Sequence, residues 1–501
     1  MLLRPDVADF RLIGFYTGKV LIGTGAAMAL PLLVALVLGE ANDAAAFTIG
    51  AGLALSVGIS SQLALRTRAS MTTSHGLAVA ALSWLLAPVF GAVPLLLSGH
   101  YASFLDAYFE AVSGFATIGL TIVNDVDHLS RSGSLWRHLM QFLGGQGILV
   151  VVLTMMAGGA GRVGSLYAGE GREERILPNI VRTAQFIWRV ALAYGLIGTV
   201  LLVVALLLAG VPLAQAPFHA VTLFITAFDT AGFSPQSASA AFYRSPLVEA
   251  ILAVLMLAGA LSFALHYQLW QGRRRELWRN IETRTLLVSI VSLFALLAVG
   301  LGRAGTFTDF PGLFRHGFFQ LVNAHTTGGL GTLPGRMFVT DWGVLAPAVL
   351  VTAMAIGGMA GSTAGGIKAI RLGLIVKGLR RDIRRVLLPE DAVVIETYHS
   401  TTRRVLRDEQ VRGAVTVLLL YLGLYLGGGL LGLFFGYPFD QAMFESTAAA
   451  SSGGLSVGLV RPQLEWPLKI AYIAQMVVGR LEFVAVFALV GYVVAIARGR
   501  V

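Results

Sequence analysis

The sequence predicts an all-α polytopic membrane protein. We expect four pseudo-symmetric helix–pore-loop–helix repeats around one central pore, preceded by two extra transmembrane helices. Three observations predict this class. The 501-residue chain is 56% hydrophobic and only 13% charged, whereas soluble domains carry about 25% charged residues. Apolar runs of about 20 residues, the length that crosses a bilayer, recur along the whole chain. A short motif, Thr or Ser, any residue, Gly, then Leu or Phe, recurs between them.

The apolar runs define ten candidate spans and four shorter segments. The first run is longer than the apolar core of a secretory signal, so we expect it to be retained as a span. The shorter segments are rich in Gly and Thr, and we expect them to re-enter the membrane from one side, lined by protein or water. The spans are 12–38, 45–65, 76–98, 138–160, 185–210, 245–271, 284–303, 342–378, 411–436 and 467–497, and the shorter segments are 103–120, 215–233, 312–330 and 439–455.

The basic residues predict the orientation. The net charge is +10, and most Lys and Arg fall in the loops on the side of the two termini. The positive-inside rule therefore places both termini in the cytoplasm and the short segments on the outer side. The charge is then a topology signal, and nucleic acid is not an expected partner. The chain has no cysteine, which excludes disulfides and thiolate metal sites.

The longest polar stretch, 377–412, leaves two interpretations open. It is either a solvated linker in contact with lipid headgroups or a docking segment for a cytosolic partner. Its many arginines suit both.

The four motif copies divide the chain into repeats. Each copy ends a short apolar segment between two spans, and its last glycine is Gly119, Gly232, Gly329 or Gly454. The predicted organisation is two N-terminal helices (1–70), then pore repeats 1 (71–180), 2 (181–280), 3 (281–395) and 4 (396–501). Close helix packing through glycine is the alternative, but packing glycines belong within spans rather than in short hairpins.

The motif suits a filter for a monovalent cation. Backbone carbonyls can replace the water shell of an ion, and glycine permits the backbone that turns them inward. Carboxylate rings, which divalent ions prefer, are absent from these loops, where Asp229 is the one acid. The expected filter residues are Ala116, Thr117, Ile118, Gly119, Asp229, Thr230, Ala231, Gly232, Thr326, Thr327, Gly328, Gly329, Ser451, Ser452, Gly453 and Gly454. The expected K⁺ ligands among them are Thr117, Ile118, Thr230, Ala231, Thr327, Gly328, Ser452 and Gly453.

A glycine-rich stretch within the run 342–378 is unsuited to a regular lipid-facing helix, because each glycine costs up to about 1 kcal/mol of helix propensity. It is either a kinked helix that packs closely on its neighbours or a flexible loop beneath the filter that closes the pore. Arg480, within the last apolar run, is the kind of intramembrane charge that faces a partner or a cavity. Our hypothesis is that Arg480 contacts this loop below the filter; a structural ion pair is the alternative. The gate residues would be Gly357, Gly358, Gly361, Ser362, Thr363, Gly365, Gly366, Lys368 and Arg480.

Beyond the loops, three stretches resemble the Trk/Ktr/HKT potassium transporter superfamily, and its TrkH/TrkG branch in particular. They are 143–150 (LGGQGILV), 357–368 (GGMAGSTAGGIK) and 479–482 (GRLE). The resemblance implies K⁺ as the transported ion bound in the filter, with no organic cofactor on this chain. It also implies a homodimer in the cell (inner) membrane, with a cytosolic TrkA-like ring of nucleotide-binding subunits. In that family four filter glycines accompany K⁺ preference, and serine in the first filter accompanies Na⁺ permeation. The chain departs from the family pattern at Ala116, Ile118, Asp229 and Gln146.

Competing functions are a Na⁺-permeable relative, an alternating-access cation transporter, whose repeats are twofold, and an enzyme. The usual catalytic motifs of polytopic enzymes are missing, so we expect no enzymatic activity.

Several other polar residues leave a choice of roles. Asp229 either concentrates cations or caps a loop. We expect Glu110 and Glu445 to hydrogen-bond backbone from the pore helices, His325 and His219 to pack, and Lys368 to anchor the glycine-rich loop at the cytoplasmic boundary by snorkelling.

Overall fold

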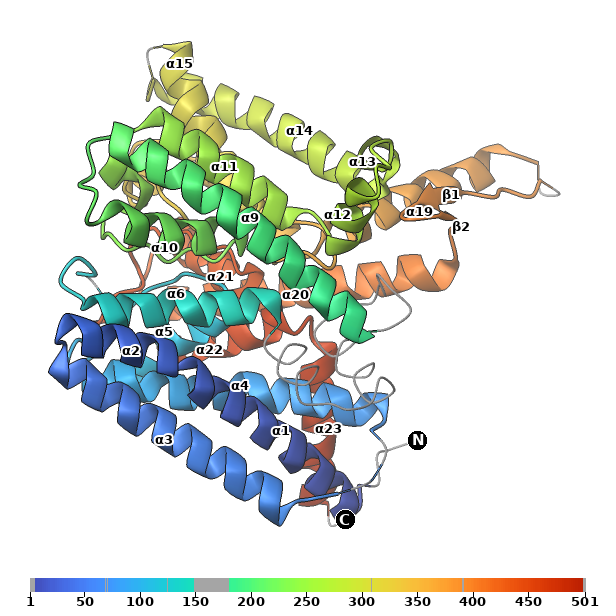
Figure 1. Ribbon diagram of the computed structural model, residues 1–501. Helices are drawn as coiled ribbons and strands as arrows, with labels where there is room; N and C mark the ends of the chain where they lie inside the picture. The colour runs from blue at the N-terminus through green and yellow to red at the C-terminus, as the bar shows by residue number, and fades with distance from the viewer. Residues whose placement is uncertain are drawn as a thin grey trace.

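The computed structural model describes residues 5–67, 69, 71–123, 125–147, 180–307, 309–389 and 392–498, and these residues are predominantly helical (Figure 1). The all-α polytopic class is therefore confirmed. The long helices run in one general direction, and α19, the start of α1 and the end of α23 lie at the same end of the bundle.

The two extra helices precede the first motif segment. They are α1 (Val7–Ala27) with its continuation α2 (Ala29–Leu38), and α3 (Ala41–Ala64). The helices α1 and α3 pack closely, because a Cβ on Gly58 would lie 2.7 Å from Gly18 O, and one on Gly18 would lie 2.9 Å from Gly58 O. Small residues allow this backbone approach in a membrane, where packing replaces the hydrophobic effect.

The remaining elements follow the order helix, short helix, helix. The first group is α4 (Thr73–Leu97), α5 (Phe104–Phe115) and α6 (Arg131–Gln146). The second is α9 (Ile180–Leu208), α10 (Ala216–Phe228), η1 (Ser239–Tyr243), α11 (Pro246–Ala260) and α12 (Phe263–Trp270). The third is α13 (Glu276–Arg279), α14 (Ile281–Ala304), α15 (Phe310–Gly312), the π-helix η2 (Leu313–Phe318), α16 (Phe319–His325), α17 (Met337–Thr340), α18 (Leu345–Ile356) and α19 (Ala369–Leu387). The fourth is α20 (Asp408–Phe434), α21 (Phe439–Ser451), α22 (Trp466–Arg480) and α23 (Val484–Ala497).

Three predicted spans are not single helices. Within the described residues six helices are long and apolar enough to cross a membrane unbroken, counting α1 with α2 as one. The run 245–271 bends by 100° between α11 and α12, and 467–497 bends by 113° between α22 and α23. The run 342–378 is interrupted between Ile356 and Ala369, and α19 continues beyond it to Leu387. The run 138–160 begins within α6, and its part after residue 147 lies outside the described residues.

Three long helices make the same close contact with a short helix. Where α6, α11 and α22 reach the end of a short helix, a glycine touches a backbone carbonyl of that helix. A Cβ on Gly144 would lie 1.8 Å from Phe115 O, one on Gly259 1.9 Å from Phe228 O, and one on Gly479 1.9 Å from Ala450 O. The long helices thus end or bend against the short ones.

The described part of the stretch 377–412 contains the end of α19 and two short strands. Strands β1 (Thr397–His399) and β2 (Arg403–Val405) pair antiparallel, with Thr397 opposite Val405. Glu396 accepts hydrogen bonds from Lys377 at 2.8 Å and Arg384 at 3.2 Å. The Lys377 ammonium in particular holds the pKa of the Glu396 carboxyl below its ordinary value. This region projects from the bundle in Figure 1.

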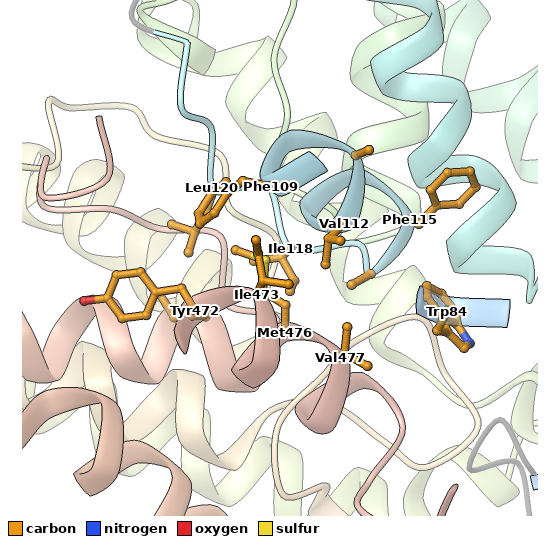
Figure 2. Packing of buried hydrophobic residues seen from close by; sticks show 14 of the residues in the cluster. Trp84, Phe109, Val112, Phe115, Ile118, Leu120, Tyr472, Ile473, Met476 and Val477 are labelled. Carbon is orange, nitrogen blue, oxygen red and sulfur yellow. The ribbon is translucent and has the colours of Figure 1, made fainter. Parts of the chain in front are cut away.

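The core nearest the first motif segment joins α5 to α22 (Figure 2). Ile118 and Val112 pack with Ile473, Met476 and Val477 in one buried cluster. The side chain in the middle of the motif thus points outward into the core.

Candidate ion-conducting pore

The four motif loops meet at one place. A Cβ on Gly119 would lie 2.4 Å from Gly232 Cα, one on Gly329 2.4 Å from Gly232 Cα, and one on Gly454 2.8 Å from Gly329 Cα. The ring closes because the Gly454 position also lies 2.1 Å from Ile118 O. The loops are therefore arranged around an axis in chain order, and the predicted filter glycines are together.

The backbone repeats the same unusual conformation in each loop. The hydroxyl residue has positive φ in all four copies: 51° at Thr117, 48° at Thr230, 58° at Thr327 and 58° at Ser452. The last glycine is also positive, from 61° at Gly454 to 89° at Gly119. Positive φ is rare for β-branched threonine and persists only where the surroundings impose it. Four such occurrences at matched positions indicate a backbone shaped for a common purpose.

This conformation turns carbonyls inward and side chains outward. The Ile118 side chain is fully buried in the α5–α22 core, while its carbonyl oxygen faces the Gly232 and Gly454 positions. Ala231 O likewise lies 2.5 Å from a Cβ on Gly119. Carbonyl oxygens gathered at an axis are the groups that coordinate a dehydrated monovalent cation.

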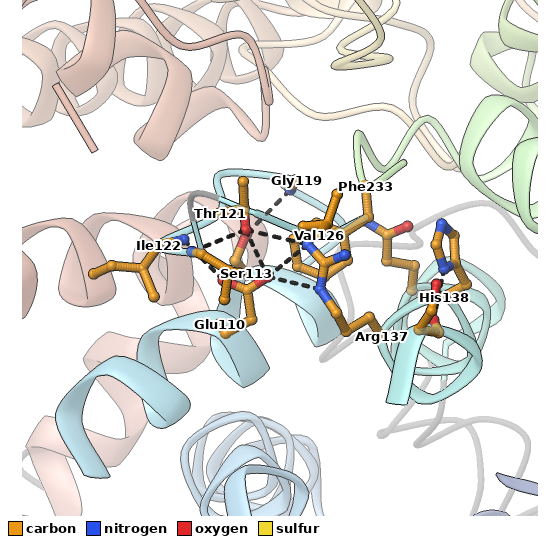
Figure 3. A network of polar contacts seen from close by, with 12 residues as sticks. Glu110, Ser113, Gly119, Thr121, Ile122, Val126, Arg137, His138 and Phe233 are labelled. Atoms are coloured by element: carbon orange, nitrogen blue, oxygen red, sulfur yellow. Dashed lines mark hydrogen bonds and ion pairs between the residues drawn. The ribbon is translucent and has the colours of Figure 1, made fainter. Parts of the chain in front are cut away.

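Loop 1 is held by a buried ion pair (Figure 3). Glu110 accepts hydrogen bonds from Ile122 N at 2.9 Å and Thr121 Oγ1 at 2.9 Å, and pairs with Arg137 at 2.7 Å. The Arg137 side chain is 1% exposed, and its guanidinium lies 4.1 Å from the ring centroid of Phe233, which follows the glycine of loop 2. The pair therefore connects two neighbouring loops.

The other loops use different side chains for the same purpose. Thr226 donates to Phe233 O at 2.7 Å in loop 2, and Asn323 accepts from Leu330 N at 2.9 Å in loop 3. Glu445 accepts from Val457 N at 3.0 Å and Leu459 N at 3.1 Å in loop 4. The predicted backbone bonding by Glu110 and Glu445 is confirmed.

The glycine-rich loop (357–368) lies directly beneath the motif loops. Gly365 N donates to Thr327 Oγ1 at 2.9 Å, and the hydroxyls of Thr230 and Thr363 are 3.2 Å apart. A Cβ on Gly365 would lie 2.0 Å from Ser451 O. The loop thus contacts motif loops 2, 3 and 4, and two of these contacts involve the hydroxyls of Thr230 and Thr327.

Arg480 reaches the same loop. Its guanidinium donates to Thr363 O at 3.0 Å and to Gly144 O at 2.9 Å. The predicted contact is confirmed, but Arg480 is the last residue of α22 and not the middle of a straight span. Glu482 lies within the break between α22 and α23 and pairs with Arg371 of α19.

The weaker candidates fall into place around these loops. His325 is fully buried with Nε2 2.7 Å from Ser289 Oγ, and His219 Nδ1 lies 2.9 Å from Tyr243 OH, so both pack as expected. The snorkelling role of Lys368 is wrong: its side chain is buried and donates to Ala364 O within the loop. Asp229 is the C-cap residue of α10.

Sequence reasoning missed several residues that support the loops. Arg137, Gln141 and Asn323 are completely or almost completely buried polar side chains. Gln141 donates to Ala231 O at 2.5 Å. Gln141 is a polar residue within the apolar run 138–160, and this is the signal that could have found it, whereas Arg137 lies just before the run.

The fold and the converging loops define a polytopic membrane transport protein and not an enzyme. The chain belongs to the TrkH family of cation transport proteins, which matches residues 45–491.

Individual relatives agree. An uncharacterized cation transporter of Methanocaldococcus jannaschii is 30% identical, over 83% of this chain and 82% of its own length. The Trk system potassium uptake protein TrkH of Halomonas elongata is 29% identical, over 96% of this chain and 98% of its own. The crystal structure of the potassium transporter TrkH from Vibrio parahaemolyticus superimposes with a TM-score of 0.81 at 26% identity, covering 96% of this chain and 98% of that one.

Proposed function

We propose that this chain is the ion-conducting subunit of a Trk-type K⁺ uptake system. The observation that carries the proposal is the convergence of four Thr/Ser-x-Gly loops on one axis, with the hydroxyl residues at positive φ. The relatives named as potassium uptake proteins support K⁺ as the ion. The driving force would be the membrane potential, about 2.3 kcal/mol per charge per 100 mV.

The four loops form the filter in this proposal. Carbonyl oxygens of Thr117, Thr230, Thr327 and Ser452 and of the residues that follow them would hold K⁺. The oxygens are almost all neutral, which favours a monovalent ion over a divalent one. A ring of carbonyl oxygens that the fold holds in place replaces the water oxygens that K⁺ loses on entering the filter. Little free energy is then needed to rearrange the ring around the ion.

The glycine-rich loop forms the gate. It contacts three of the four motif loops, and Arg480 attaches it to α6 through Gly144. A positive charge at this position repels a cation leaving the filter. Opening would require the loop and Arg480 to separate, which the glycines permit.

The setting of this pore is also part of the proposal. Both termini and α19 lie in the cytoplasm, the protein is in the cell (inner) membrane, and the chain forms a homodimer that binds a cytosolic TrkA-like ring. The basic loops at that end of the bundle support this orientation. A Na⁺-permeable or alternating-access transporter is the alternative function.

K⁺ and Na⁺ flux into liposomes tests the filter, with wild type compared against Gly119→Ser. A side chain at Gly119 must displace loop 2, since its Cβ would lie 2.4 Å from Gly232 Cα. We expect wild type to prefer K⁺, and Gly119→Ser to lose that preference.

Gly210→Ser is the matched control. Gly210 has nearly the same φ, 88° against 89°, but no atom lies within 4 Å of its Cβ position. This variant should keep K⁺ preference. A wild type that prefers Na⁺ would overturn the assignment of the ion.

A further inference from the structure

Asp229 stands out among the residues of the motif loops. It is the acid in the expected filter set, and the equivalent positions carry Ala116, Thr326 and Ser451. Its side chain is fully buried. Burying a carboxylate costs free energy unless other groups hydrogen-bond to it or balance its charge. The residues around Asp229 must therefore provide such partners.

Two residues of α6 hold this carboxylate in position. Gln146 Nε2 donates to Asp229 Oδ1 at 2.7 Å. Gly145 leaves room for it, because a Cβ there would lie 2.6 Å from both Asp229 Cγ and Oδ1. A hydrogen-bond donor and a matched hollow, both from a different repeat, indicate that the position of the carboxylate is specified.

Arg480 binds the other side of the same segment. Its guanidinium donates to Gly144 O, the residue next to Gly145. It also donates to Thr363 O, and Thr363 in turn donates to Phe228 O at 3.0 Å, next to Asp229. Arg480 and Asp229 are therefore both hydrogen-bonded to the segment 144–146 of α6, and Thr363 links Arg480 to the residue before Asp229. Water does not fully screen charges in such a buried region.

We propose that Asp229 is the counter-charge of Arg480 in the cation pathway, and that Gln146 and Gly145 position it. This inference rests on the proposed function. Arg480 alone would hold the glycine-rich loop but would also repel cations from the filter above it. Asp229 offsets that repulsion, so the loop remains attached while the filter still holds its ion.

Flux of K⁺ into liposomes tests the electrostatic role. Asp229→Asn keeps the shape of the side chain and removes its charge, and we expect flux to fall about tenfold, as for a charge pair at intermediate dielectric constant. In an Arg480→Gln background the same change should alter flux less than about twofold, since the charge that Asp229 is proposed to balance is then absent. Gln146→Met should reduce flux in wild type and have no effect when Asp229 is already Asn. Asp43→Asn, in the first turn of α3, is the control for charge removal outside the pore.

Two flux results would overturn the inference. One is an Asp229→Asn variant with wild-type flux. The other is an equal fall with and without Arg480, which would assign Asp229 an independent role in loop 2.

A stability cycle keeps the inference testable if wild type itself carries no K⁺, a result that would overturn the proposed function instead. Thermal unfolding in detergent of wild type, Asp229→Asn, Arg480→Gln and the double variant measures the coupling directly. We expect the two changes to be non-additive, with the double variant more stable than the sum of the single losses predicts. Additive losses of stability would overturn the assignment of Asp229 as the counter-charge of Arg480, whatever the flux assay shows.

Discussion

At the scale of single residues, the Glu110–Arg137 pair is, among the described residues, the most deeply buried ion pair beside the motif loops. The side chains are 0% and 1% exposed. Burying two charges repays its cost only when both are present and hydrogen-bonded. Here Glu110 also accepts a hydrogen bond from the backbone of the segment after Gly119, so the pair contributes to the shape of loop 1 as well as to stability.

Arg137→Met should therefore be strongly destabilising. It leaves Glu110 as an uncompensated buried charge, a loss of about 3–5 kcal/mol in the free energy of unfolding. Arg381→Met is the matched control, because the carboxylate that it leaves, Asp408, is 64% exposed and stays solvated, and pairs with an exposed partner contribute about 0–1 kcal/mol. Thermal unfolding in detergent compares the two. Equal melting temperatures for both variants would contradict the assignment.

The site residues that could be predicted from sequence are those whose role depends on the backbone conformation of their own short segment. Gly119 and Gly454 follow a hydroxyl residue at a fixed spacing, and a glycine in that position signals the positive φ that the structure shows. Arg137 could not be paired with Glu110 in this way. The pairing depends on how α6 packs against α5, and nothing in the 26 positions between Glu110 and Arg137 encodes it.

At the scale of elements, the contacts between long and short helices decide where spans bend. Gly259 lies in α11, where the helix touches the end of α10. The local sequence of 245–271 is ordinary for a helix, so its propensity predicts a straight span. The bend follows contact with the short helix, which is why the apolar runs 245–271 and 467–497 could be found from sequence but their breaks near 261 and at 481–483 could not.

Gly259→Ala should destabilise the protein for this reason. Its Cβ would lie 1.9 Å from Phe228 O, so either α10 or α11 must move, and motif loop 2 moves with α10. Gly427→Ala is the control, since it is helical and open, with nothing within 4 Å. That change should stabilise by up to about 1 kcal/mol, the difference in helix propensity. Melting temperatures that shift in the same direction would contradict the contact.

The glycine-rich loop is the element whose removal should affect conduction without affecting selectivity. Deleting 358–366, or replacing Arg480 with Ala, removes the obstruction or its attachment at Thr363 O. We expect K⁺ flux to rise in both variants while the preference for K⁺ over Na⁺ remains, because the motif loops are unchanged. Unchanged flux in both would remove the gate from the proposal.

At the scale of the whole molecule, the expected orientation in the membrane follows from the distribution of basic residues. It can be tested by introducing single cysteines into the otherwise unchanged chain. The chain contains no cysteine, so a single introduced thiol is the sole target of a membrane-impermeant maleimide. His128, 83% exposed between α5 and α6, lies on the expected outer side, and the exposed Thr402, between β1 and β2, lies on the expected inner side.

His128→Cys should be labelled in intact cells and Thr402→Cys only in inside-out vesicles. The physical reason is that basic segments such as 377–412 remain on the cytoplasmic side during insertion. Because α19, β1 and β2 project from the end of the bundle where α1 begins and α23 ends, a cytoplasmic Thr402 also places both termini inside. Labelling of the two thiols in the reverse pattern would show that the orientation in the membrane is opposite to the one proposed. The glycine-rich loop and Arg480 would then face the outside, where they could not gate the inner mouth of a K⁺ uptake pore.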